Sequence, residues 1–117
     1  MYSEFDMMMG FDKIELGYEV HMAGFDGECF MYSIYFDKEA TENDLSNIKA
    51  AVSDFAAKSE SNGIYAGYTD VSLTDEKVNI FLDLGNVEPE NCDHIINGIL
   101  KAIDVVPNIK RVIINED

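Results

Sequence analysis

Two hydrophobic periodicities alternate along the chain, and their order constrains the fold more than any single motif. Along residues 78–84, Val78, Ile80 and Leu82 alternate with polar or aromatic neighbours, as in a strand with one buried face. Residues 95–103 instead repeat apolar positions at helical spacing. The apolar residues of this stripe are Ile95, Ile96, Ile99, Leu100 and Ile103. A chain that switches between these periods predicts a domain of mixed α and β structure.

The same criteria, applied along the whole chain, predict the order ββαββαβ. Strands are expected over residues 14–22, 29–36, 65–73, 78–84 and 109–115. One helix is expected between the N-cap Thr41, with Asp44 three residues on, and the stop signal Asn62-Gly63. A second is introduced by Pro89 and Asn91 and ended by Pro107-Asn108. Turn residues at 23–28 and 74–77 predict that the first four strands form two hairpins.

This element order predicts an α+β fold with a mainly antiparallel five-stranded sheet. Two helices are too few to cover both faces, so we expect them on one face. Residues 1–117 are expected to form a single domain, since no linker is visible. Phe5, Met7, Met9 and Phe11 alternate, so residues 1–10 are expected to be either a short strand or a flexible lead-in.

Acidic residues are in excess in both halves of the chain. The 23 Asp and Glu outnumber the 8 Lys and Arg, which gives a net charge of −15. Such a surface argues against nucleic-acid binding and against docking on an anionic membrane, because both require basic residues. It suits either simple solubility or the attraction of a basic protein partner.

The cysteines and the N-terminus indicate the compartment. The first residues are acidic where a signal peptide is basic, and no apolar run reaches the length of a membrane span. We therefore expect a cytoplasmic protein in which Cys29 and Cys92 stay reduced.

If the helices cover one face of the sheet, strand phase predicts which side chains line the other. This open face is expected to carry Glu15, Glu19, His21, Met31, Ser33, Tyr35, Tyr68, Asp70, Phe81 and Asp83. Carboxylates interleaved with aromatic rings suit Lys and Arg, which pair with acids and stack on rings. The alternative is that aromatic residues are there only because they favour strands and pair across them.

Motifs for catalysis and for cofactor binding are absent from the sequence. It contains no glycine-rich phosphate loop, nucleophile elbow or zinc-protease motif, and only two histidines. Cys29, Cys92, His21 and His94 have the composition of a zinc site, but Cys92 and His94 are only two residues apart at a helix start. Glu88, Glu90, Asp93 and Asp83 lack the spacing of a calcium loop. We therefore expect no metal, no cofactor and no enzymatic activity.

In size, acidity and element order the chain resembles bacterial immunity proteins, which neutralise toxins. The resemblance implies an interaction protein that inhibits a basic partner such as a toxin. Strand phase alone assigns the contact residues, which are Glu15, Glu19, Tyr35, Tyr68, Asp70, Phe81 and Asp83. A small-ligand or metal-binding accessory domain is the alternative, and an enzyme that uses Glu19, His21 or Asp83 as acid or base comes third. An unpaired edge strand would also permit a homodimer.

Overall fold

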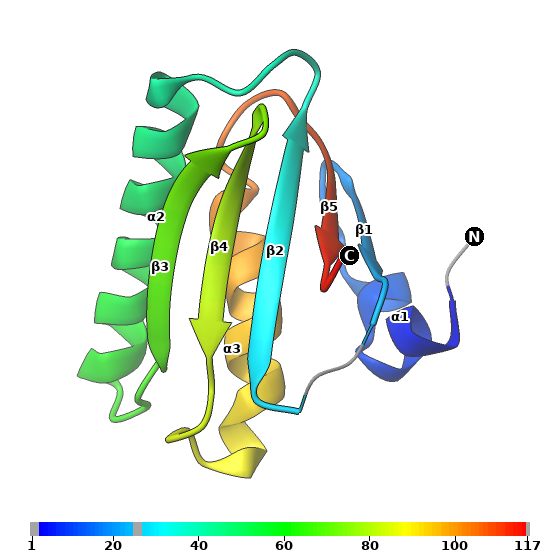
Figure 1. Cartoon of the computed structure of the whole chain (residues 1–117). Helices are drawn as coiled ribbons and strands as arrows, with labels where there is room; N and C mark the ends of the chain where they lie inside the picture. The colour runs from blue at the N-terminus through cyan, green and yellow to red at the C-terminus, as the bar shows by residue number, and fades with distance from the viewer. Residues whose placement is uncertain (1–2, 25–26, 117) are drawn as a thin grey trace.

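A computed structural model of the chain describes residues 3–24 and 27–116. Its five-stranded sheet has the order β1-β5-β2-β4-β3, with α2 and α3 layered behind it (Figure 1). The α+β class and the five strands are as predicted from the sequence. The strands are β1 (Glu19–Met22), β2 (Cys29–Phe36), β3 (Tyr68–Thr74), β4 (Lys77–Asp83) and β5 (Ile109–Ile114), and the longer helices are α2 (Glu42–Ser61) and α3 (Pro89–Ile103).

The predicted first hairpin is wrong, because β5 lies between β1 and β2. Val112 of β5 is the register partner of Val20 in a parallel pair and of Ile34 in an antiparallel pair. The sheet is therefore mixed. The position suits β5, which has apolar side chains on both faces of the sheet: Ile114 is buried on the helix side, and Ile113 is half-buried on the other.

The first strand is also shorter than predicted. It begins at Glu19, because the main-chain N–H of Gly17 donates to Asp104 Oδ1 at 3.0 Å and so leaves the strand ladder. Ile14 and Leu16 still pack against the core, but from an irregular segment. Glu15 is exposed in that segment and is not on the open face of the sheet.

A third helix, which the sequence prediction missed, precedes β1. α1 (Glu4–Met8) forms where the sequence left a short strand as one option, and it is followed by a 3₁₀ turn (Phe11–Lys13). Ser3 and Asp6 form a reciprocal cap, in which Asp6 N–H donates to Ser3 Oγ and Ser3 N–H donates to Asp6 Oδ2. Met9 and Phe11 are buried in the core.

The two longer helices follow the sequence prediction closely. Thr41 caps α2, and its side chain accepts from Asp44 N–H in a capping box. The apolar stripe predicted for α3 is buried. The helices approach closely at Gly98, where an added Cβ would lie 2.3 Å from the Phe55 ring.

The helix layer covers one face of the sheet and leaves the other to solvent. On the covered face Phe30, Tyr32 and Ile34 of β2 are buried, and Tyr32 OH donates to the Ile96 carbonyl of α3 at 3.0 Å. Burial raises the pKa of Tyr32 well above its ordinary value.

In the described ranges, no helix combines the length and apolar character needed to cross a bilayer.

Candidate functional site

Strand register arranges the open face in rows that cross the sheet. In one row Met31 pairs with Phe81 and Phe81 with Asp70; in the next, Cys29 pairs with Asp83 and Asp83 with Tyr68. Apart from Glu15, the residues predicted for this face alternate with core-facing ones, and they are Glu19, His21, Met31, Ser33, Tyr35, Tyr68, Asp70, Phe81 and Asp83.

One end of the open face carries an exposed aromatic patch, which we define as Met31, Tyr68 and Phe81 with the flanking acids Asp70 and Asp83. Tyr68 is 60% exposed and Met31 is 37% exposed. The Tyr68 and Phe81 rings meet edge to face, with centroids 6.5 Å apart. β4 and β3 thus present the rings of Phe81 and Tyr68, and β2 presents Met31, between two carboxylates.

The other end carries a polar cluster, which we define as Ser33, Tyr35, Lys77, Arg111 and Glu116. The Tyr35 hydroxyl donates to Glu116 Oε2, and Lys77 Nζ lies 3.4 Å from the same oxygen. Burial alone would raise the pKa of Glu116, but the Tyr35 hydrogen bond and the Lys77 charge outweigh it and lower the pKa. Burial alone would lower the pKa of Lys77, yet Tyr35 and Glu116 raise it. Contacts within the cluster therefore stabilise the charged forms of Lys77 and Glu116.

Arg111 completes this cluster. Its guanidinium carbon lies 4.8 Å from the centre of the Tyr35 ring, a cation–π arrangement, and Lys77 Nζ approaches the same ring at 5.3 Å. The Tyr35 ring is therefore already in contact with two cations of the same chain. In sheet register Arg111 also separates Tyr35 from Glu19. The structure thus brings Tyr68, Asp70, Phe81 and Asp83 together, and places Tyr35 and Glu19 elsewhere.

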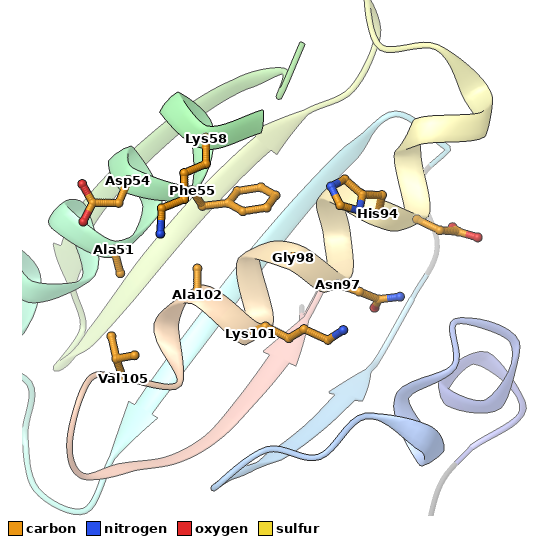
Figure 2. Close-up of a pocket in the computed structure, with 11 residues that line it drawn as sticks. Ala51, Asp54, Phe55, Lys58, His94, Asn97, Gly98, Lys101, Ala102 and Val105 are labelled. Atoms are coloured by element: carbon orange, nitrogen blue, oxygen red, sulfur yellow. The ribbon is translucent and has the colours of Figure 1, made fainter. Parts of the chain in front are cut away.

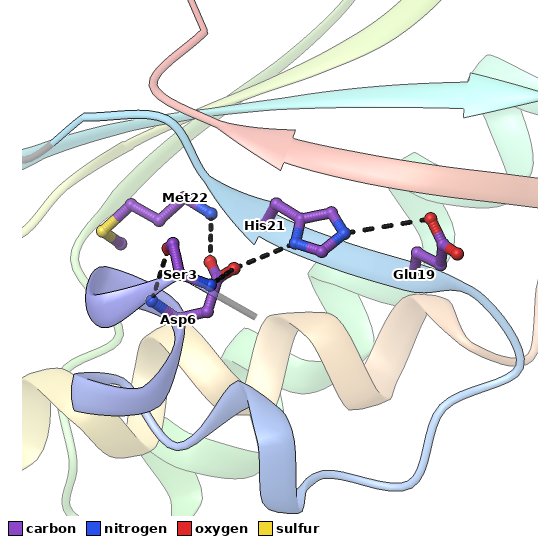
Figure 3. Close-up of polar contacts among 5 residues, drawn as sticks. All are labelled: Ser3, Asp6, Glu19, His21 and Met22. Atoms are coloured by element: carbon purple, nitrogen blue, oxygen red, sulfur yellow. Dashed lines mark hydrogen bonds and ion pairs between the residues drawn. The ribbon is translucent and has the colours of Figure 1, made fainter. Parts of the chain in front are cut away.

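At β1, a buried carboxylate from α1 anchors the edge of the sheet (Figure 3). Asp6 Oδ1 accepts Met22 N–H at 2.6 Å, and Asp6 Oδ2 lies 2.9 Å from His21 Nδ1. Burial alone would raise the pKa of Asp6, but the bonds from His21, Met22 and Ser3 together lower it. The sequence analysis did not single out Asp6; the spacing of Ser3 and Asp6, a capping-box pattern, was the available signal.

A groove of about 670 Å³ lies between α2 and α3, within the helix layer (Figure 2). Ala51, Phe55 and Ala102 supply apolar lining, while Lys58 and Asp54 lie at its α2 side. The His94 and Phe55 rings are 6.2 Å apart across it. The groove mixes both charge signs, unlike the aromatic patch.

The four residues with the composition of a zinc site are spread over three elements. Cys29 is on β2 and His21 on β1, whereas Cys92 and His94 are on α3. Across residues 3–24 and 27–116, no group of three or more His, Cys, Asp or Glu side chains gathers where it could hold a metal ion. Burial, helped by Asp93 and Glu90, raises the pKa of the Cys92 thiol.

The groups considered as acid or base in an enzyme are also separated. Glu19 and His21 lie on β1 at one edge of the sheet, with His21 Nε2 3.8 Å from Glu19 Oε2. Asp83 lies on β4, where its Oδ1 accepts Gly85 N–H at 2.9 Å. The strand order places β5 and β2 between them.

Comparisons with protein-family models, with curated proteins and with solved structures found no match.

Proposed function

We propose that this chain is a non-enzymatic interaction protein, an immunity protein or inhibitor that binds and neutralises a basic partner such as a toxin. The observation that carries the proposal is the aromatic patch. Tyr68, Phe81 and Met31 expose apolar surface between Asp70 and Asp83 on a protein of net charge −15. Aromatic anchors within a polar rim are typical of protein interfaces.

The two kinds of residue in the patch have different roles in this proposal. Tyr68 and Phe81 act as anchors, because burying their rings removes apolar area from water. Asp70 and Asp83 add to the negative potential that draws a basic partner toward the patch. Tyr35, which was predicted from the sequence as a contact residue, contributes less here because Arg111 and Lys77 already stack on its ring.

The proposal is tested by isolating the partner from the native host and measuring binding kinetics with matched variants. We expect Tyr68→Ala to speed dissociation, with a loss of about 2 kcal/mol if the ring is a hot spot. Tyr65→Ala is the control, since Tyr65 is 48% exposed but precedes the strand. Asp70→Asn should slow association and weaken its salt dependence.

Two results would contradict the proposal. The first is a partner that proves to be acidic. The second is binding that survives Tyr68→Ala and Phe81→Ala unchanged but is lost when the groove between α2 and α3 is altered, for example by Phe55→Ala.

A further inference from the structure

The two edges of the sheet differ in whether they can accept another strand. β1 has only four residues, and α1 packs beside it (Figure 1). The N–H of Met22 is already bound to Asp6 Oδ1. A short, covered edge with its donor occupied resists pairing with another chain.

α2 packs against β3 (Figure 1), but the edge of this strand lacks the protection found at β1. β3 pairs with β4 over seven residues, from Tyr68 opposite Asp83 to Thr74 opposite Lys77, without a register shift. It contains no proline, lysine or bulge, which are the usual devices against edge pairing. In the described part of the chain, no hydrogen bond reaches the main chain of β3 from any element but β4.

The side chains of β3 define what an added strand would meet. Tyr68 and Asp70 are exposed on the open face, next to the rest of the aromatic patch. Val71 and Leu73 point to the helix side and remain only half-buried. Because side chains alternate along a strand, an added segment would place one set beside Asp70 and the other beside Val71.

Charge selects between the possible occupants of this edge. Asp75 and Glu76 are exposed in the turn after β3, and Asp83 lies opposite Tyr68 at its other end. Two copies of β3 paired antiparallel about Val71 would place Asp75 of each opposite Gly67 of the other, close to Asp83. Like charges at both ends disfavour a second copy and favour a basic strand.

We propose that the basic partner adds an extended segment to the free edge of β3, with Lys or Arg on the side of Asp70 and apolar residues on the side of Val71. This inference rests on the proposed function and specifies its binding mode. Main-chain hydrogen bonds to β3 would supply affinity, and the alternating side chains would supply specificity.

The test uses an end-capped, fluorescently labelled peptide of alternating Lys and Val with seven residues, the length of β3. Two further versions carry N-methyl groups on alternate residues, one on each edge of the peptide strand. We expect the parent to bind with perturbed amide signals in residues 68–74 and not in residues 19–22. One N-methylated version should bind at least about tenfold more weakly, and the other should bind like the parent.

Two charge controls complete the design. A peptide with Glu in place of Lys should not bind. Asp70→Lys should weaken binding of the Lys peptide more than Asp93→Lys, which makes the same charge change on an exposed position of α3.

The outcomes separate this inference from the proposed function. If both N-methylated peptides bind like the parent, or if the perturbed amides lie outside β3, strand addition is overturned while charge-selective binding still supports the function. Failure of the Lys peptide to bind, or a dimer through β3 seen by sedimentation, also overturns strand addition. Equal binding of the Glu and Lys peptides would remove the electrostatic basis of the proposed function itself.

Discussion

Asp6 is the clearest case of one side chain holding distant parts of the chain together. It is fully buried, it caps its own helix through Ser3, and it binds both the main chain of Met22 and the ring of His21. A buried carboxylate is stable only when its oxygens are hydrogen-bonded, and both oxygens of Asp6 are. The docking of α1 on β1 depends on this residue.

Replacing Asp6 by Ala should therefore destabilise the protein by about 1–3 kcal/mol, because Met22 N–H loses its acceptor in a buried position. Urea unfolding measures the loss. Asp12→Ala is the control, since Asp12 is an exposed acid in the adjacent 3₁₀ turn. If the two variants are equally stable, Asp6 does not anchor α1.

The same residue predicts a pH dependence. The pKa of Asp6 in the folded protein lies below its ordinary value of 3.8, so its stabilisation is complete above that value. It is lost as the pH falls through the lower, folded pKa. The stability difference between the wild type and Asp6→Asn should therefore shrink in acid, which urea unfolding at a series of pH values would show. A difference that grows in acid would contradict the prediction.

Among the elements, the β3–β4 hairpin is held by an unusual turn. Asp75 and Glu76 both have positive φ, 52° and 67°, as a two-residue type I′ turn requires. Residues with a Cβ adopt this conformation at a cost of roughly 1 kcal/mol each. The fold accepts that cost because the long pairing of β3 with β4 fixes the turn.

Glu76→Gly should consequently stabilise the protein by about 0.5–1 kcal/mol, since glycine adopts positive φ without the steric cost. Chemical denaturation measures the gain. Glu76→Ala removes the same charge but keeps the Cβ, so it should give no comparable gain. Equal gains from both changes would show that charge, and not backbone strain, limits the turn.

At the contact between α2 and α3, replacing Gly98 should have two opposing effects on stability, one on helix propensity and one on packing. Gly98→Ala raises helix propensity by about 1 kcal/mol, but its Cβ would overlap the Phe55 ring, and overpacking costs typically 1–3 kcal/mol. We expect a net loss of stability. Adding Phe55→Leu should relieve the clash, so a double-mutant cycle should show positive coupling between the two sites. Simple additivity would contradict this account.

Elements with strong local signals could be predicted from the sequence. The Thr41 cap and the buried stripe of α3 both follow from nearby residues. Local alternation along the strands also predicted that Asp70 and Phe81 lie on the same, open face of the sheet. The strand register, in which the two residues are partners, confirms this. Strand order does not follow, because nothing near residues 14–36 indicates that β5 separates β1 from β2. For that reason Arg111 and Glu116 could not be placed beside Tyr35.

At the scale of the whole molecule, a net charge of −15 on a chain of 117 residues makes the folded state repel itself. Added salt should relieve this repulsion, because it shortens the Debye length to about 8 Å at 0.15 M. We expect the Tm to rise by a few degrees between low and moderate NaCl concentration. Replacing Asp12, Asp54 and Asp93 by Asn should reduce that rise. A Tm that falls with NaCl would show that attractive pairs such as Lys77–Glu116 outweigh the repulsion.

The placement of β5 also determines when the sheet can be assembled during synthesis. On the ribosome, the hairpin of β3 and β4 can pair with β2 as soon as β4 has emerged, but β1 has no strand beside it until Val112 has been made. Until then, Val20 and Met22, both buried in the finished protein, lack their sheet neighbours. The sheet is therefore complete only after this last strand has been made. Premature termination before β5 would release a three-stranded sheet of β2, β4 and β3 with the β2 edge unpaired, and β1 unattached, both of which favour aggregation.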